Sequence, residues 1–91
     1  MTFITLMKAA PGFTDQVLHK LREGQLALPE PVEVLSWWVT FGQYDFVAIW
    51  DAPDQRAANL AVRQLASEGL VVTETMLAQR PEEFTRPLEE E

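Results

Sequence analysis

The chain has 91 residues, of which 47% are hydrophobic, and it carries a formal net charge of -7 and no cysteine. The length suits one domain with a small core, the lack of cysteine excludes disulfide and thiol chemistry, and no apolar run approaches the roughly 20 residues of a membrane-spanning helix. Nor is there the basic stripe that binding to a phosphate backbone requires. We therefore expect a cytoplasmic domain that binds neither membranes nor nucleic acid.

The chain begins with one predicted strand and one predicted helix. Residues 2–8 alternate weakly and stop at a turn cluster, which is typical of a strand. Thr14 is a suitable N-cap, and apolar residues at helical spacing predict a helix over residues 15–27. Pro29 and Pro31 end this helix.

A β-hairpin is predicted at the centre of the chain. Residues 34–41 and 44–51 are rich in Val, Ile, Phe and Trp, which suit a buried pleated surface. Gly42, the first of the two residues between them, suits a type II′ turn. This turn would pair Phe41 with Tyr44 and so fix the register.

Alternation along the two strands gives both faces of the hairpin an apolar character. The first strand divides into Leu35, Trp37, Val39 and Phe41 against Val34, Ser36, Trp38 and Thr40. The second divides into Tyr44, Phe46, Ala48 and Trp50 against Asp45, Val47, Ile49 and Asp51. Since neither face is plainly polar, we expect the hairpin to be covered on both sides.

The second half predicts another helix and a last strand. Asp54 caps a helix whose apolar stripe consists mostly of small residues, which let a helix lie close to a sheet. The stripe comprises Ala57, Ala58, Ala61, Val62 and Leu65. Gly69 ends the helix in a left-handed conformation, and residues 71–78 form the last strand. Residues 82–91 make an acidic tail, with a short helical turn over 82–88.

The resulting order is β-α-β-β-α-β, which predicts one α+β domain of the ferredoxin-like type over residues 1–81. In this fold a four-stranded antiparallel sheet carries two helices on one face. The other face would remain open in a monomer although it bears bulky apolar residues. We therefore predict a homodimer that forms through the open sheet face, as a dimeric α+β barrel.

The run TFGQYDFVAIWDAPDQRAA and the later run VVTETMLAQRPEEF resemble the GYD-domain family, named for a Gly-x-Tyr-Asp hairpin that is here Gly42, Tyr44 and Asp45. The opening FITLMK is also similar to the first strand of that family. The resemblance implies a small bacterial protein of the dimeric α+β barrel type, in a family without an assigned general activity. More distantly, the hairpin and last strand resemble the ligand-binding domain of leucine-responsive regulators, which binds amino acids between subunits.

Five residues are candidates for a ligand site: Tyr44, Asp45, Trp38, Trp50 and Glu74. Tyr44 and Asp45 suit the mouth of a cavity, but packing by the tyrosine and hydrogen bonding of the aspartate to backbone N–H groups are the favoured explanation. Successive Trp37 and Trp38 point to opposite faces, one toward the helices and one toward the dimer partner. Core packing and interface anchoring compete with ligand binding as explanations of the tryptophans.

Glu74 and His19 are the remaining titratable residues of interest. Glu74 lies in the middle of an apolar strand, so it either reaches solvent at an edge or is buried, with a raised pKa that would suit a general acid or base. His19 is the one histidine and is expected on the surface, without a catalytic role. With no cysteine beside it, no metal site and no cofactor are predicted.

Three functions of different classes follow from this sequence. The first is a binding or interaction module for a small molecule or a partner protein. The second is a cofactor-independent enzyme, a small oxygenase or isomerase with Glu74, Tyr44 and the tryptophans around a buried cavity. The third is a stand-alone amino-acid-sensing module. Fold type alone does not choose among them.

Overall fold

A computed structural model of the chain describes residues 1–22 and 30–89. The elements follow in the order β1 (Thr2–Ala9), α1 (Thr14–Arg22), β2 (Glu33–Val39), β3 (Phe46–Asp51), α2 (Gln55–Ser67), β4 (Val71–Ala78) and α3 (Pro81–Glu89). The end of the predicted first helix, after residue 22, lies outside the described residues. The predicted α+β arrangement of the ferredoxin-like type is confirmed, and the short turn expected in the acidic tail is a helix, α3.

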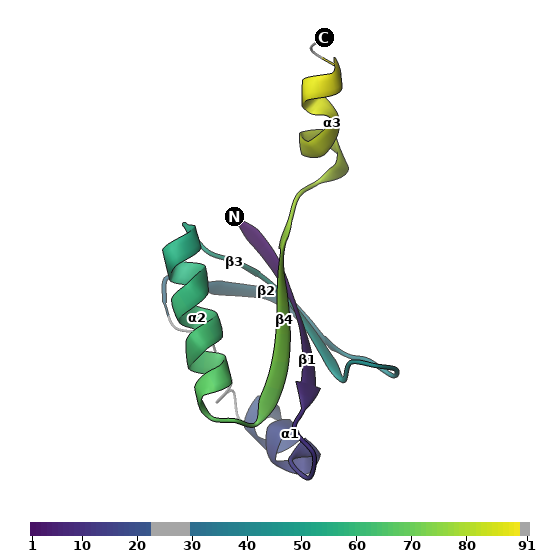
Figure 1. The fold of residues 1–91 in the computed structure, drawn as a ribbon, viewed down its shortest axis with the longest axis vertical. Helices are drawn as coiled ribbons and strands as arrows, with labels where there is room; N and C mark the ends of the chain where they lie inside the picture. The colour runs from purple at the N-terminus through teal and green to yellow at the C-terminus, as the bar shows by residue number, and fades with distance from the viewer. Residues whose placement is uncertain (23–29, 90–91) are drawn as a thin grey trace.

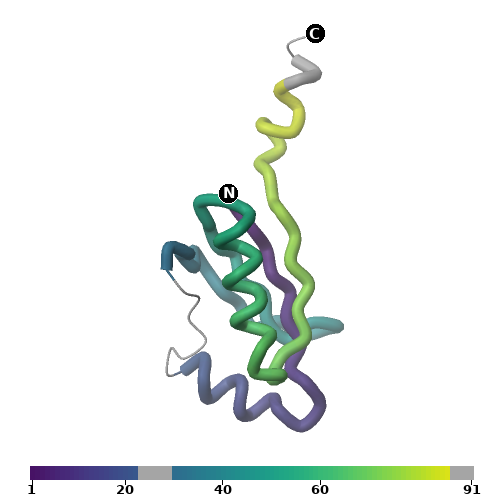
Figure 2. The backbone as a smooth tube through the Cα atoms, turned by 60° about the vertical axis from the view of Figure 1, so that its left-hand side comes forward, coloured from purple at the N-terminus to yellow at the C-terminus, as the bar shows by residue number. Residues whose placement is uncertain are grey.

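The four strands form one antiparallel sheet in the order β2-β3-β1-β4. β1 and β3 are therefore the central strands, and β2 and β4 are the edges. Figure 1 shows α2 lying along one face of the sheet and α1 at the end of the sheet where β1 stops and β4 begins. Figure 2 shows the same arrangement from another side, with α3 beyond the far end of β4.

The core lies between the sheet and the helices. On β1 the alternation is clear, because Phe3, Thr5, Met7 and Ala9 are buried. β3 adds Phe46, Ala48 and Trp50 to this layer. From the helices, Val17, Ala58 and Ala61 close the core, and the small alanines allow α2 to approach the strands. Trp50 is 1% exposed and its ring stacks on Phe3, with 4.8 Å between the centroids.

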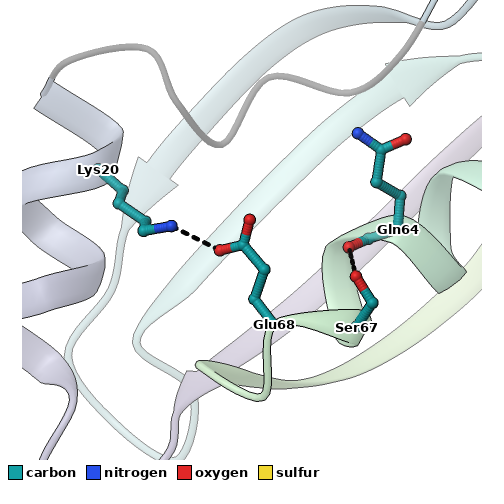
Figure 3. Close-up of polar contacts among 4 residues, drawn as sticks. All are labelled: Lys20, Gln64, Ser67 and Glu68. Atoms are coloured by element: carbon teal, nitrogen blue, oxygen red, sulfur yellow. Dashed lines mark hydrogen bonds and ion pairs between the residues drawn. The ribbon is translucent and has the colours of Figure 1, made fainter.

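Among the contacts of the described residues, α1 is joined to the rest of the domain by its buried face and by the ion pair of Lys20. Val17 is fully buried in the core. Lys20 Nζ lies 2.6 Å from a carboxylate oxygen of Glu68, which follows the last turn of α2 (Figure 3). In the same turn the Ser67 hydroxyl donates to the Gln64 carbonyl at 2.7 Å. An exposed ion pair contributes about 0–1 kcal/mol, so burial of Val17 is the larger part of this attachment.

The hairpin has the predicted register but not the predicted turn. Trp37 pairs with Ala48 and Val39 with Phe46, as pairing of Phe41 with Tyr44 would require. The strands stop at Val39 and resume at Phe46, so the connection is a loop over residues 40–45. The predicted two-residue type II′ turn is therefore wrong.

Two observations explain the wider loop. Gly42 has a φ of 159°, which is almost extended, whereas the first central residue of a type II′ turn has φ near about +60°. The Thr40 side chain instead donates to the Tyr44 carbonyl at 2.6 Å, and the Thr40 N–H donates to the Asp45 carbonyl at 2.8 Å. The hydrogen bonds that close the loop therefore start at Thr40 and not at Phe41, which makes the loop wider than a two-residue turn. A second irregularity, between Val34 and Ser36, shifts the pairing by one residue.

Both ends of α2 match the sequence. The Asp54 carboxylate accepts the Ala57 N–H at 2.8 Å, which confirms the predicted N-cap. Gly69 has a φ of 71°, the left-handed conformation expected after a helix. The Asp51 carboxylate, three residues before this cap, accepts a hydrogen bond from the Thr2 hydroxyl at 2.7 Å.

The N-cap of α2 makes a first prediction. Replacement of Asp54 by alanine removes the acceptor of the Ala57 N–H and should lower the free energy of unfolding by ~1 kcal/mol. Urea unfolding followed by circular dichroism measures the change. Asp54→Asn, which keeps a side-chain oxygen at the cap, is the matched control and should stay close to the parent protein. Equal losses in the two variants would show that the cap bond is not the cause.

Candidate functional site

The face of the sheet turned away from α2, called the open face below, is built from apolar rows that cross all four strands. In one row Trp38 pairs with Val47, Val47 with Leu6, and Leu6 with Glu74. The next row consists of Ser36, Ile49, Ile4 and Met76. The edges are the least covered, since Trp38 is 61% exposed and Met76 is 41% exposed. The bulky apolar character predicted for this face is confirmed.

The Tyr44 hydroxyl donates a 2.6 Å hydrogen bond to a carboxylate oxygen of Glu74. Tyr44 lies just before β3, and Glu74 lies on β4, so the tyrosine side chain crosses the intervening strand β1 to reach it. Continued strand alternation would have placed Tyr44 on the same face as Trp50. Because residues 40–45 form a loop, that alternation stops before Phe46 and Tyr44 turns to the open face.

Glu74 controls the ionisation of Tyr44. The hydrogen bond to the carboxylate raises the pKa of Tyr44 above its ordinary value of 10.0, and desolvation and the negative charge of Glu74 act in the same direction. A phenol that donates to a carboxylate keeps its proton, since ionisation would place two negative groups side by side. At neutral pH the pair therefore presents a neutral phenol and a carboxylate.

Asp45 anchors the loop to the centre of the sheet. Its carboxylate accepts the Ala9 N–H at 3.0 Å, and its own N–H donates to the Met7 carbonyl at 2.9 Å. These bonds extend the pairing of β1 beyond Phe46, the first residue of β3. The hydrogen bonding to backbone N–H groups predicted for Asp45 is thus present, with β1 as the partner, and it holds the neighbouring Tyr44 over the sheet.

The tryptophans divide between the two sides of the sheet. Trp38 pairs with Val47 on the open face, and Trp37 pairs with Ala48 on the side of the helices, as the sequence predicted. Trp50 does not join Tyr44 and Glu74: it is buried beneath the helices, where its indole N–H donates to the Thr5 hydroxyl at 2.8 Å. Four of the five candidate residues thus lie on or beside the open face, and Trp50 lies in the core.

The open face also has a polar contact that the sequence analysis missed. The Thr2 hydroxyl donates to Asp51 at the end of the face opposite to Tyr44 and Glu74. Thr2 and Asp51 are paired across β1 and β3, which only the register could reveal. The apolar rows are therefore bounded by a polar pair at each end.

α3 extends away from the sheet. Phe84, on this helix, is 71% exposed. The chain measures 52 × 29 × 18 Å with a radius of gyration of 14.8 Å, against about 12 Å for a compact domain of this length. Figures 1 and 2 show α3 apart from the other elements in both views.

Within residues 1–22 and 30–89, no three His, Asp or Glu side chains come together as a metal site would require. None of the described helices is long and apolar enough to cross a membrane. His19 is exposed on α1, away from the open face.

The strand order and the paired helices define a small α+β domain of the ferredoxin-like class. Residues 14–88 match the model of the GYD domain. The chain therefore belongs to the GYD-domain family, as its hairpin suggested, and no curated protein matches it.

The solved structures that are similar to this chain include the following two. The crystal structure of FFRP-DM1 shares 26% sequence identity with a TM-score of 0.63, over 86% of this chain and 97% of that one. The hypothetical protein PHS023 from Pyrococcus horikoshii shares 24% identity with a TM-score of 0.60, over 89% of this chain and 93% of that one. The second likeness shows the fold alone.

Tyr44 is the single tyrosine of the chain, so tyrosinate absorbance reports on it directly. We predict that it titrates with a midpoint above pH 10.0 and that Glu74→Ala lowers this midpoint, because the acceptor and its charge are removed. Glu82→Gln, on α3, is the control and should leave the midpoint unchanged. Equal midpoints for Glu74→Ala and the parent protein would contradict the assignment.

The raised pKa also makes stability depend on pH in one direction. A group whose pKa is higher in the folded state contributes its full stabilisation below its unfolded pKa, here 10.0, and loses it as the pH rises through the folded pKa. The free energy of unfolding should therefore fall above pH 10.0 in the parent protein. It should fall less in Tyr44→Phe, which has no phenol to ionise.

Proposed function

We propose that this protein is a homodimeric binding module of the cytoplasm, whose two open faces pack together and hold a small molecule at their boundary. The observation that carries the proposal is the open face itself, with apolar rows that end in the exposed Trp38 and Met76. Monomeric proteins seldom leave contiguous apolar surfaces of this kind in water. Residues 1–81 would form the folded body, and the acidic tail over residues 82–91 would lie outside it.

The exposed area supports association. The chain exposes 6612 Å², whereas a folded monomer of its mass exposes roughly 5,400 Å². The excess is larger than the roughly 800 Å² that each partner buries in an interface of standard size. A second copy that covers the open face and contacts α3 would remove an area of this order.

The polar pairs at the two ends of the open face support a ligand at the boundary. When two such faces pack together, Tyr44 and Glu74 would lie at the edge of the interface, with apolar side chains behind them. A carboxylate bonded to a neutral phenol offers its remaining lone pairs to a donor. Glu74 would therefore bind the ammonium or other N–H group of a small molecule.

An amino acid fits this description. Its ammonium group would be the donor to Glu74, and its side chain would contact the apolar rows. The resemblance of the hairpin and last strand to the ligand-binding domain of leucine-responsive regulators supports the same choice. We therefore favour the stand-alone sensing module as the particular form of the binding proposal.

The enzyme hypothesis has less support. It requires Glu74, Tyr44 and the tryptophans around one buried cavity. Trp50 lies on the other side of the sheet, stacked on Phe3, and Glu74 is exposed in the single chain.

The dimer can be tested with two substitutions of equal charge on opposite sides of the sheet. Met76→Glu places a carboxylate on the open face and should shift the protein from dimer to monomer at micromolar concentration, because the charge would be buried at the interface. Leu60→Glu places the same charge on an exposed position of α2 and should leave the dimer intact. Sedimentation velocity gives the mass, and circular dichroism verifies that both variants fold. A monomeric parent protein would overturn the proposal.

The ligand can be sought separately by native mass spectrometry of freshly purified protein. The dimer should retain an added mass that is lost in Glu74→Ala while the dimer itself persists. A dimer that carries no added mass, also after incubation with an equimolar mixture of the common amino acids, would contradict the sensing proposal and leave the dimer standing.

A further inference from the structure

A second candidate site lies on the other side of the sheet, where α2 runs beside the edge strand β4. The two elements bound a groove of about 460 Å³. Its apolar walls include Phe3, Val62 and Leu77, and its polar groups come from Gln55, Asn59, Arg63 and Thr75. The volume falls within the range of about 300–1,000 Å³ found for small-molecule sites. Because the groove is on the helix side, packing of two open faces would leave it uncovered.

A chain of hydrogen bonds leads from the core to this groove. The buried indole of Trp50 donates to the Thr5 hydroxyl at 2.8 Å, and the Thr5 and Thr75 hydroxyl oxygens lie 2.9 Å apart. A hydroxyl has one hydrogen to donate. Thr5 is 2% exposed, and among the described residues Thr75 is the one acceptor within reach of its hydrogen.

This arrangement sets the direction of the bond between the two threonines. If Thr75 donated to Thr5, the hydrogen of Thr5 would be buried without an acceptor, which costs about 1–3 kcal/mol. Thr5 therefore donates to Thr75. The hydrogen of Thr75 is then available to an acceptor in the groove, which Thr75 lines.

Asn59 and Arg63 also direct donors to the groove, while Gln55 adds a side-chain carbonyl oxygen to its lining. The carbonyl oxygen of Asn59 already accepts from Gln55 at 3.1 Å, so Asn59 presents its amide hydrogens. Arg63 can only donate, and among the described residues it forms no ion pair. Three donors, one of them positively charged, thus border an apolar groove that has no carboxylate in its lining.

We propose that this groove binds a small carboxylic acid with an apolar body. The carboxylate would pair with Arg63 and accept from Thr75, and the body would lie against Phe3, Val62 and Leu77. A carboxylate satisfies several donors at once, and a charge-assisted bond to a guanidinium is stronger than a neutral one. The occupant is thus an aliphatic or aromatic carboxylate, which the positive charge of Arg63 favours over an amine.

The test uses the indole N–H signals in nitrogen–proton correlation spectra, with sodium octanoate as the probe. The chain has three tryptophans, and single Trp37→Phe and Trp38→Phe variants identify the signal of Trp50. Octanoate should shift the Trp50 signal, because a new acceptor on Thr75 polarises the chain of hydroxyls that ends at the indole. The signals of Trp37 and Trp38 should not move.

Two arginine variants on α2 supply the matched comparison. Arg63→Gln should weaken octanoate binding at least tenfold, as the loss of a charge-assisted bond implies. Arg56→Gln removes the same charge from an exposed position outside the groove and should change the affinity less than twofold. Thr75→Val should abolish the shift of the Trp50 signal.

Three outcomes would overturn the proposal. The first is an equal response to octan-1-ol, which would show that the groove takes apolar chains without regard to charge. The second is an unmoved Trp50 signal at saturating octanoate. The third is a change in the signals of the groove residues when the protein concentration rises in the absence of octanoate. This change would show that a second copy of the chain occupies the groove.

Discussion

The arrangement of the whole domain depends on the burial of one indole. Trp50 is the largest side chain in the core, and its N–H is a donor that has to be satisfied away from water. Thr5, the one buried polar side chain among the described residues, supplies the acceptor, and Thr75 supplies the next. The chain of bonds joins β3, β1 and β4 on the helix side, so one polar requirement of the core also fixes which side of three strands faces α2.

The side of the sheet that Trp50 occupies determines which residues form the open face. Once Trp50 and Phe46 face the helices, Val47 and Ile49 must face away from them, together with their partners Trp38 and Leu6. A sheet of four strands with helices on one side cannot cover this second surface by itself. The apolar open face is therefore a direct consequence of how the core is built, and it is the reason that we propose a second copy as its partner.

Most of the fold was predictable because it depends on short-range patterns. The order of elements, the range of the last strand, the cap at Asp54 and the left-handed Gly69 all follow from residue types at fixed spacing. The register of the hairpin was also correct from Ser36 to Val39, since the alternation of large apolar residues leaves little choice, but not before the irregularity at Val34. The predicted turn was wrong, because Thr40 forms hydrogen bonds within the loop that no sequence pattern indicates.

The candidate site was harder to predict from the sequence than the fold. Assigning Tyr44 to a strand placed it beside Trp50 and on the wrong side of the sheet. The pairing of Tyr44 with Glu74 joins residues far apart in the chain, and so does the contact of Thr2 with Asp51. Such contacts depend on strand order, and no local pattern encodes it.

β4 connects the two proposed sites. Its even residues, Glu74 and Met76, belong to the open face, and its odd residues, Thr75 and Leu77, line the groove beside α2. Because alternate side chains of a strand are fixed to one backbone, a displacement of β4 by a carboxylate in the groove would also move Glu74 relative to Tyr44. As an edge strand, β4 has a neighbour on one side only and is freer to move than β1 or β3. The two proposed sites thus share one strand, and alternate residues of β4 belong to each.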